Sequence, residues 1–411
     1  MGNLIIRNAR IVTPIGKSAV KGRKMGELSE IPDAFIIITD GIITHIGKND
    51  NIPFLPDIND YEVFDAKGNV ALPGFVDSHT HLIFGGFRPD EFEWRLKGDT
   101  YMSIMERGGG IQSTVNATKE ASSEHLVKKA GWFLDQMSRM GVTTVEAKSG
   151  YGLDFETELK MLEVIENLNR SEETNLQIVP TFLGAHAIPP EYKGRTSEFV
   201  DTLIEWLPKL KNKARFCDVF CERNVFEIDD SRRLLEAARE HGYKLKLHAD
   251  EIVTLGGGEL SAELNAVSAD HLLHVSDEGV KRMAEAGVVA TLLPLTAFAL
   301  KEPYAPARKF IDSGCAVALA TDLNPGSCFS GSIPLTIALA CIYMKMNIEE
   351  TITALTLNGA AALDMADEIG SIEIGKKGDV VILGSDNYRV LPYYVGMNCV
   401  QTTIFRGKIL I

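Results

Sequence analysis

Two histidines stand two positions apart in the stretch FVDSHTHLIF, which runs from residue 75 to residue 84. The surrounding residues are typical of a buried strand, and side chains at alternate positions of a strand point to the same face. His79 and His81 are therefore expected to converge on one point. An imidazole pair with a third histidine and a carboxylate is typical of a site for Zn²⁺ or Fe²⁺. The candidates for the other two ligands are His248 and Asp322.

Further polar residues follow the other short apolar runs of the chain. Taken singly, a buried histidine is more often a hydrogen-bonded core residue than a ligand. The joint pattern favours function, because five of the nine histidines follow predicted strands and burying so many imidazoles without partners is costly. The polar residues at these positions are His79, His81, Glu146, Lys148, Tyr151, His186, Glu222, His248, Asp250, Glu251, Asp270, His271 and Asp322.

The pattern of candidate ligands favours a catalytic metal over a structural one. A structural zinc site is normally closed, rich in cysteine and built in short loops. The four candidates are spread over about 240 residues and include no cysteine. A site with few protein ligands leaves room for water, and a bound metal lowers the pKa of that water toward ~7.

The middle of the chain contains the elements that position these residues. Short apolar runs alternate with longer helix-like segments such as 122–141 and 229–242, which is typical of repeated βα units. Eight such units predict a closed (β/α)₈ barrel of class α/β, with its chemistry at the carboxyl ends of the strands. A doubly wound open sheet is the alternative. The predicted strands are 74–82, 142–148, 177–184, 216–222, 244–249, 267–272, 288–293 and 316–321.

The two ends of the chain have a different pattern. Residues 1 to about 70 contain strand-forming runs around Asp-Gly and Lys-Gly turns, and the end of the chain alternates apolar and polar residues between glycines, as in antiparallel sheets. We therefore predict two domains. Residues 1–70 and 371–411 together form a small β domain, and residues 71–370 form the catalytic barrel.

Composition restricts the partners. The formal net charge of -14 repels phosphate backbones, so no nucleic-acid partner is expected. The six cysteines form no CxxC pair, which favours reduced thiols in the cytoplasm. The N-terminus lacks the features of a secretory leader, and no stretch reaches the ~18 apolar residues that a membrane span requires. We expect a cytoplasmic protein that acts on a small molecule and has no membrane partner.

Several motifs resemble those of the amidohydrolase superfamily: PGFVDSHTH is followed far downstream by KLHADE, SADHL and ATDLNPGS. The resemblance narrows to the imidazolonepropionase family and covers the chain roughly from Pro73 to Gly370. It implies a metal-dependent hydrolase on a (β/α)₈ barrel, with a small β-sandwich built from both chain ends. The motifs that carry it are HTHLIFGGFRPDEFEWRLKGDTYMSIMERGGGI, VEAKSGYGLDFETELKML, FLGAHAIPPEY, HADEI and TDLNPGS.

This resemblance implies hydrolysis of the cyclic amide bond of 4-imidazolone-5-propanoate to N-formimidoyl-L-glutamate in histidine degradation. It also implies the roles of individual residues. The implied metal ligands are His79, His81, His248 and Asp322. The implied substrate contacts are Arg88, Tyr151, His186, Glu251, Asn324, Gly326 and Ser327. Proton transfer is expected from Glu251, His271 and Asp322, and His186 is a candidate donor to the developing oxyanion.

The residue types suit this reaction. The forked donors of Arg88 match the carboxylate of the propanoate tail, although a surface salt bridge is the alternative for this residue. Tyr151 can hydrogen-bond the ring or the tail, or it packs beneath a glycine-rich loop. A metal-activated water would attack the ring carbonyl, with Glu251 and His271 holding its proton.

The resemblance also bears on the number of metal ions. Many two-metal amidohydrolases carry a carboxylated lysine at the end of the fourth strand, and the corresponding FCDVFCE has none. We expect one Zn²⁺ or Fe ion per subunit and, from the family, a homodimer. Two alternatives stay open. One is another mononuclear amidohydrolase or deaminase acting on a different ring, although a neutral nucleobase would not need Arg88. The other is an inactive barrel that serves as a scaffold, which the full ligand set argues against.

Overall fold

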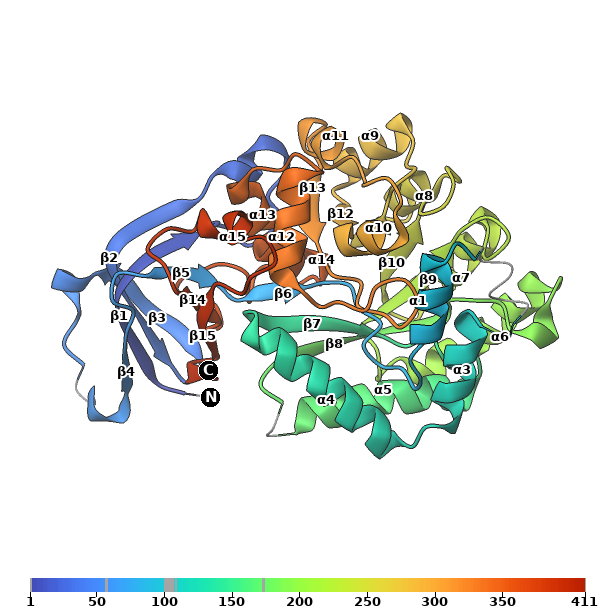
Figure 1. Ribbon diagram of the computed structural model, residues 1–411, viewed down its shortest axis with the longest axis horizontal. Coiled ribbons are helices and arrows are strands. Elements are labelled where there is room, and N and C mark those ends of the chain that lie inside the picture. The colour runs from blue at the N-terminus through green and yellow to red at the C-terminus, as the bar shows by residue number, and fades with distance from the viewer. Residues whose placement is uncertain (1, 56–57, 100–106, 108, 172–173, 411) are drawn as a thin grey trace.

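The structure, a computed structural model, has two parts: a parallel barrel covered by helices and a second eight-stranded sheet beside it (Figure 1). The second sheet lies at the left of Figure 1, and both ends of the chain lie next to it. The resemblance motif that begins at His79 includes residues 100–106 and 108, which lie outside the described residues. The structure describes residues 2–55, 58–99, 107, 109–171 and 174–410.

Eight strands form the barrel in the order in which they occur in the chain, and every neighbouring pair is parallel. The predicted (β/α)₈ architecture is therefore confirmed, and the open-sheet alternative is wrong. The strands are β6 (Phe75–Asp77), β7 (Val142–Lys148), β8 (Gln177–Ala185), β9 (Phe216–Cys221), β10 (Lys244–Ala249), β11 (Ser268–His271), β12 (Val289–Leu292) and β13 (Ala316–Leu319).

The first strand is shorter than the predicted 74–82, because its ladder with β7 ends at Asp77. Beyond Asp77 the chain stays extended, because single backbone hydrogen bonds join it to β7 on one side and to the segment after β13 on the other. The carbonyl of Thr80 accepts a hydrogen bond from the Lys148 N–H (3.0 Å), while Thr80 itself forms a parallel bridge with Leu323. The His81 N–H donates to the Leu323 carbonyl (2.9 Å). These bonds close the barrel and leave the segment in the alternating geometry that a strand would have.

Strand alternation separates an apolar outer layer from a polar interior. In β10, Leu245 and Leu247 belong to the large apolar core beneath the helices. The intervening Lys246 and His248 are also buried, but they make their polar contacts inside the barrel. Because the side-chain period of a strand is two residues, the sequence KLKLHA places one apolar and one polar set on opposite faces.

Helices cover the outside of the barrel (Figure 1). None of the described helices is long and apolar enough to cross a membrane. They are α1 (Pro89–Leu96), α3 (Ile111–Glu120), α4 (Ser123–Arg139), α5 (Phe155–Arg170), α6 (Thr196–Leu210), α7 (Ile228–Glu240), α8 (Gly257–Glu263), α9 (Asp277–Ala286), α10 (Pro294–Leu300), α11 (Ala307–Asp312), α12 (Ile333–Ile342), α13 (Ile348–Leu355), α14 (Leu357–Ala362) and α15 (Val390–Tyr393). Short 3₁₀ helices are η1 (Gly22–Gly26), η2 (Asn49–Asn51), η3 (Ile58–Asp60) and η4 (Pro190–Tyr192).

The helix α4 shows why such segments fold as they do. The Ser122 hydroxyl caps its first turn by accepting a hydrogen bond from the His125 N–H (3.2 Å), which satisfies a donor that has no partner inside the helix. Apolar residues then recur every three or four positions and form one buried face. The residues of that face are Leu126, Ala130, Leu134 and Met137.

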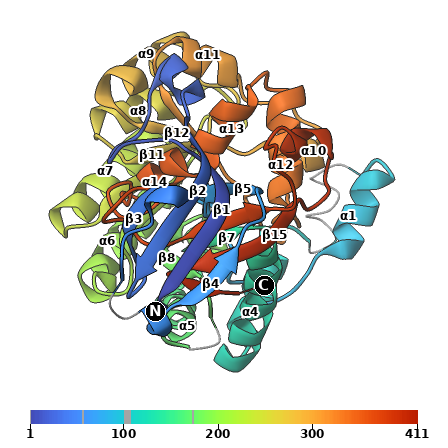
Figure 2. The same ribbon diagram turned by 90° about the vertical axis from the view of Figure 1, so that its left-hand side faces the viewer.

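The second sheet joins the two ends of the chain. Its order is β16-β15-β14-β5-β1-β2-β3, and β4 pairs with β1. The C-terminal β14 pairs with β5, and Figure 2 faces this side of the molecule, with the N-terminal strands β1, β2 and β4 in blue. The division into 1–70 plus 371–411 and 71–370 stays a prediction. The strands are β1 (Leu4–Thr13), β2 (Ser29–Thr39), β3 (Ile42–Lys48), β4 (Glu62–Asp65), β5 (Val70–Pro73), β14 (Val380–Leu383), β15 (Val400–Phe405) and β16 (Lys408–Ile409).

Candidate metal centre and active site

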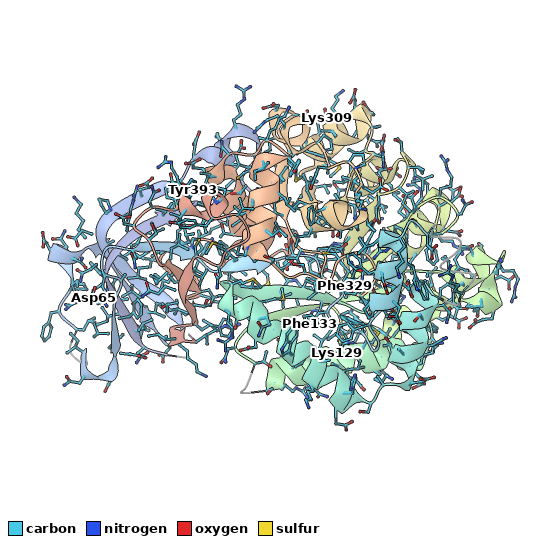
Figure 3. All side chains as sticks on the ribbon, viewed as in Figure 1. Asp65, Lys129, Phe133, Lys309, Phe329 and Tyr393 are labelled. Atoms are coloured by element: carbon cyan, nitrogen blue, oxygen red, sulfur yellow. The ribbon has the colours of Figure 1, made fainter. Side chains whose placement is uncertain are left out.

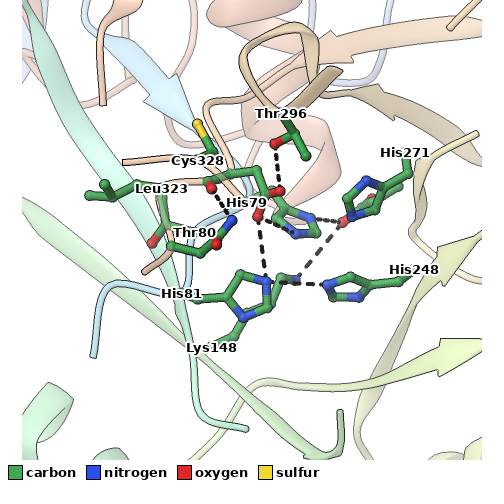
Figure 4. A network of polar contacts seen from close by, with 12 residues as sticks. His79, Thr80, His81, Lys148, His248, His271, Thr296, Leu323 and Cys328 are labelled. Atoms are coloured by element: carbon green, nitrogen blue, oxygen red, sulfur yellow. Dashed lines mark hydrogen bonds and ion pairs between the residues drawn. The ribbon is translucent and has the colours of Figure 1, made fainter. Parts of the chain in front are cut away.

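Three histidines from the ends of two barrel strands, His79, His81 and His248, point at one another (Figure 4). The His248 Nε2 lies 3.3 Å from the His81 Nε2. The Asp322 Oδ1 lies 3.5 Å from the His81 Nε2 and 3.6 Å from the His79 Nε2. One ligand nitrogen from each histidine lies within 4.8 Å of the others. The structure thus brings together the four residues proposed as ligands.

The spacing of these atoms fits a bound metal ion. In a tetrahedral shell with bonds of about 2.0–2.1 Å, ligand atoms are roughly 3.3–3.4 Å apart. The Nε2 of His79 and the Oδ1 of Asp322 are buried and have no hydrogen-bond partner among the described residues. The Nε2 atoms of His81 and His248 face each other at 3.3 Å, which is the spacing of two ligand atoms on one ion. Together these observations indicate a site for one metal ion.

Two carboxylates orient two of the histidines by contacting the ring nitrogen that faces away from the metal site. The Asp270 Oδ2 lies 2.6 Å from the His79 Nδ1, and the Asp218 Oδ1 lies 3.1 Å from the His248 Nδ1. A carboxylate can only accept here, so each Nδ1 carries the proton and each Nε2 presents its lone pair to the metal site. Such carboxylate–histidine pairs fix the tautomer and the ring orientation of metal ligands.

A buried lysine joins the carboxylates to one another. The Lys148 Nζ lies 2.7 Å from the Asp218 Oδ2, 2.8 Å from the Glu146 Oε2 and 3.9 Å from the Asp270 Oδ2, and all four side chains are fully buried. The three carboxylates raise the pKa of Lys148 against the opposing effect of burial, so its ammonium stays charged. Lys246 adds a second cation, 3.6 Å from Asp270.

Three strand-end residues adopt left-handed backbone conformations that non-glycine residues rarely occupy. The φ angles are 49° at Asp250, 74° at His271 and 55° at Asp322. Each such residue costs on the order of 1–3 kcal/mol, and such strain clusters at active sites. At Asp250 the strain is offset, because its carboxylate accepts hydrogen bonds from four successive N–H groups of residues 255–258. Asp250 is thus a structural residue, which organises the start of α8.

A cavity of about 750 Å³ opens above the metal site. His79 does not line it and lies beneath its floor. Every other predicted site residue lines the cavity, and so do Glu91, Arg95, Phe220, His274 and Glu302, among others. The predicted residues on its wall are His81, Arg88, Tyr151, His186, His248, Glu251, His271, Asp322, Asn324, Gly326 and Ser327.

Glu251 and His271 form a pair of titratable groups on this wall. The Glu251 Oε1 lies 3.5 Å from the His271 Nδ1, slightly beyond a good hydrogen bond. Burial, reinforced by the negative charge of Asp322, raises the pKa of Glu251 to about 8. A carboxyl group with a pKa near neutrality is suited to take up and return a proton.

His186 is held by the backbone of the loop after β7. Its Nδ1 lies 3.0 Å from the Gly150 carbonyl, and its ring stacks on His81 with centroids 4.8 Å apart. Burial lowers the pKa of His186 to about 3, so the ring is neutral. Since a carbonyl can only accept, the Nδ1 carries the proton and the Nε2 is an acceptor. The expected donation from His186 to an oxyanion is therefore inconsistent with this geometry.

Arg88 reaches the cavity against the loop that follows Asp322. The Asn324 Oδ1 accepts hydrogen bonds from the N–H groups of Gly326 (2.8 Å) and Ser327 (2.7 Å), which folds the loop into a tight turn. A Cβ at Gly326 would lie 2.2 Å from the Arg88 Nη2. Only glycine therefore lets the guanidinium lie across this loop. Arg95 also reaches it and donates to the Gly326 carbonyl (2.9 Å).

Some functional neighbours were missed from the sequence. Asp218 orients His248, and Thr296 donates to the Asp322 Oδ2 at 2.6 Å. Asp218 had a readable signal, since it is a charged residue alternating with apolar ones in FCDVFC. Thr296 had none, because it lies in α10 after an ordinary apolar strand.

Comparison with known proteins places the chain among hydrolases. The amidohydrolase family model matches residues 70–410. An imidazolonepropionase from Phocaeicola vulgatus is 65% identical over 411 residues, covering 99% of each chain. Another from Bacteroides thetaiotaomicron is 64% identical over 410 residues, 99% of this chain and 98% of the relative. One from Clostridium tetani is 54% identical over 413 residues, 100% of this chain and 98% of the relative.

Solved structures share the fold at low sequence identity. A 5-methylcytosine deaminase from Klebsiella pneumoniae superposes with a TM-score of 0.73 at 17% identity, covering 99% of this chain and 98% of that chain. An atrazine chlorohydrolase from Arthrobacter aurescens, solved with zinc, has a TM-score of 0.75 at 17% identity, with coverage of 99% and 95%. These likenesses establish a common fold.

Proposed function

Since this chain belongs to the amidohydrolase family and, within it, to the imidazolonepropionases, we propose that it hydrolyses 4-imidazolone-5-propanoate to N-formimidoyl-L-glutamate in histidine degradation. The observation that carries this proposal is the 65% identity to such an enzyme over 99% of the chain. In the reaction, water adds to the ring carbonyl carbon and the ring C–N bond breaks. The carbonyl carbon becomes a carboxylate, and the nitrogen takes a proton.

The site suits one metal ion, and we propose that it binds Zn²⁺ or Fe, one per subunit. The proposed ligand atoms are the Nε2 atoms of His79, His81 and His248 and the Oδ1 of Asp322. Three histidines and a carboxylate suit both metals. When bound there, such an ion lowers the pKa of a coordinated water toward ~7 and polarises a carbonyl oxygen. The chain's own residues then have to orient the ring and move the proton.

Glu251 is the proposed proton carrier. It would take a proton from the attacking water and deliver it to the departing ring nitrogen. The pKa of about 8 that burial gives it makes it able both to accept and to release a proton near neutral pH. His271, 3.5 Å away, would orient the carboxyl group. Asp322 is a second candidate through Oδ2, the oxygen that the proposed metal ion leaves free, which also accepts the Thr296 hydroxyl.

Substrate orientation is proposed to come from the opposite wall. Arg88 would bind the propanoate carboxylate with its forked donors. His186 would accept a hydrogen bond from a ring N–H through Nε2, since its Nδ1 is occupied by Gly150. Tyr151 lies against His81 and His186, with ring centroids 5.8 and 5.2 Å away, and would pack against the substrate ring. The remaining proposed contacts are Asn324, Gly326 and Ser327.

The exposed surface and the composition of the chain bear on its assembly and location. We propose a homodimer, because large apolar side chains are exposed on neighbouring elements, and contiguous exposed apolar surface often marks an interface. These residues are Ile342, Tyr343, Tyr393, Tyr394, Val395 and Met397. Light scattering behind size-exclusion chromatography would measure the mass. We also propose a cytoplasmic enzyme without nucleic-acid or membrane partners, because the chain is strongly acidic and its cysteines are free.

The test is turnover of freshly prepared 4-imidazolone-5-propanoate by metal-analysed protein. Loss of the ring's ultraviolet absorbance gives the rate, and mass spectrometry identifies the product. His79→Ala should lose both metal and turnover. The matched control is His45→Ala, an exposed histidine of β3, which should keep both. Absence of turnover with one metal ion bound per chain would discard this substrate. The runner-up, another carboxylate-bearing ring, would then be screened.

A further inference from the structure

The segment between the metal site and Arg88 has no regular secondary structure of its own. It runs from Leu82 to Phe87, between His81 and Arg88, the residue that precedes α1, and its backbone forms neither helix nor strand. Its conformation sets where Arg88 lies in the cavity. Arg88 is weakly held at its own tip, because its Nη1 lies 3.6 Å from Glu91 and its Nε has no partner among the described residues. The guanidinium lies across the loop at Gly326, while the backbone of Arg88 is placed by the segment that precedes it.

A single lysine from α4 holds this segment from outside the cavity. The Lys129 Nζ donates hydrogen bonds to the carbonyls of Gly85 and Gly86. The same ammonium lies 4.0 Å from the ring centroid of Phe84 and 3.7 Å from that of Phe87. Two carbonyl dipoles and two aromatic faces thus surround one cation, and each is attractive to it.

The same segment packs closely against α3. A Cβ at Gly85 would lie 2.2 Å from the Ala117 carbonyl oxygen of α3. The Gly85 N–H also donates to the Thr118 hydroxyl at 2.8 Å. On the outer side, however, the Phe87 ring is 56% exposed, so burial alone does not hold it. Lys129 is the group that joins this exposed ring to the backbone of the segment.

The Lys129 ammonium lies in a partly buried, aromatic environment. The Lys129 side chain is partly buried, and this burial lowers its pKa to about 8. Lys129 lies close to Phe133 on α4 (Figure 3), and the Phe133 ring contacts those of Phe84 and Phe87 with centroids 5.8 and 6.4 Å away. Among the described residues, the Lys129 ammonium contacts two backbone carbonyls and two aromatic rings of this one segment, and Lys129 is not part of the cavity wall.

We propose that Lys129 is a positioning residue that fixes the segment of residues 82–87 and thereby holds Arg88 where it binds the substrate carboxylate. The proposal rests on the proposed function in that one respect, the role of Arg88. It predicts a defect in substrate binding, with little change in the chemical step. It also predicts a local loss of order that does not depend on any substrate.

The test compares Lys129→Met with Lys128→Met, which removes the adjacent and exposed lysine of the same helix. For Lys129→Met we expect KM to rise roughly tenfold with kcat within about twofold, since uniform binding is lost. Lys128→Met should match the wild type. Lys129→Arg keeps a cation that can lie on aromatic faces and should restore most of the affinity. Thermal unfolding of each variant reports whether the whole protein is affected.

Hydrogen–deuterium exchange of residues 82–88 supplies the readout that is independent of substrate. We expect faster exchange there in Lys129→Met than in Lys128→Met, with the barrel strands protected in both. Unchanged exchange and unchanged KM in folded Lys129→Met would overturn the proposal, and so would an equal effect of Lys128→Met. If the wild type does not turn over 4-imidazolone-5-propanoate, the proposed function fails, while the exchange comparison still decides whether Lys129 orders the segment.

Discussion

Replacing Lys148 by methionine tests whether the buried charges beneath the metal site position its ligands. The Lys148 Nζ contacts Asp218 at 2.7 Å and Glu146 at 2.8 Å, and none of these side chains is exposed to solvent. Methionine is of similar length but carries no charge, so two carboxylates lose their nearest cation. Lys246 reaches Glu146 at 3.4 Å and offsets part of the loss.

The size of the expected effect of Lys148→Met follows from the burial of the charged groups that it contacts. Removing one partner of a buried ion pair costs about 3–5 kcal/mol, because the remaining charge is left uncompensated. That is a large fraction of the roughly 5–15 kcal/mol by which a folded protein is stable. Asp218 also orients His248, and loss of such an outer contact typically lowers metal affinity by about 10–100-fold. We therefore expect Lys148→Met to weaken both folding and metal binding.

The assays separate these two effects. Urea unfolding of metal-free protein measures the free energy of unfolding, and competition with a chelator measures metal affinity. Lys376→Met is the control, because Lys376 is also buried but donates to carbonyls of Gly16, Ala366 and Ile369. It should destabilise the protein without altering metal affinity. A Lys148→Met protein that binds metal as tightly as the wild type would refute the link between Lys148 and the ligands.

Three further perturbations have defined outcomes. Glu251→Gln should lower turnover by about 10²–10⁴-fold with normal metal content, and wild-type turnover would remove Glu251 from the mechanism. Gly326→Ala should raise KM, measured by steady-state kinetics, because its Cβ would lie 2.2 Å from the Arg88 Nη2; an unchanged KM would contradict this. Burial raises the pKa of Asp379 to about 6, so this group stabilises the fold below its unfolded pKa of ~3.9, and that contribution is lost as pH rises to about 6. Asp379→Asn should therefore gain up to about 3 kcal/mol relative to the wild type between pH 4 and 7 in urea unfolding. Equal pH dependence of the two proteins would exclude this role.

Much of the barrel was predictable because its strands are short apolar runs with charged residues at fixed alternation. KLKLHA and FCDVFC place one residue in two toward the interior, and parallel strands bring their carboxyl ends to one edge. That reasoning selected the candidate metal ligands His79, His81, His248 and Asp322, and the structure brings one ring nitrogen of each histidine within 4.8 Å of the others. The selection needed no knowledge of the register between strands.

Contacts that depend on register and on loop conformation were not predictable. Asp218 reaches His248 only because β9 and β10 pair with Phe220 opposite His248. The contact between Arg88 and Gly326 joins two loops far apart in sequence, and no local pattern encodes their approach. The donor role expected of His186 failed for a similar reason, because the Gly150 carbonyl that occupies its Nδ1 belongs to another strand's loop.

Two lysines outside the cavity act on different halves of the site. Lys148 lies below the metal and reaches His248 through Asp218, whereas Lys129 lies on α4 and reaches Arg88 through the backbone. The first holds groups proposed to act on the water and the ring carbonyl, and the second holds Arg88, which is proposed to bind the remote tail. Their effects should therefore be separable: Lys148→Met lowers metal affinity without a selective rise in KM, and Lys129→Met does the reverse. Because the two lysines share no partner in the part of the chain that the structure describes, the free-energy changes of the double variant should add. Strong coupling between them would mean that Arg88 and the metal ligands are positioned by one common structure.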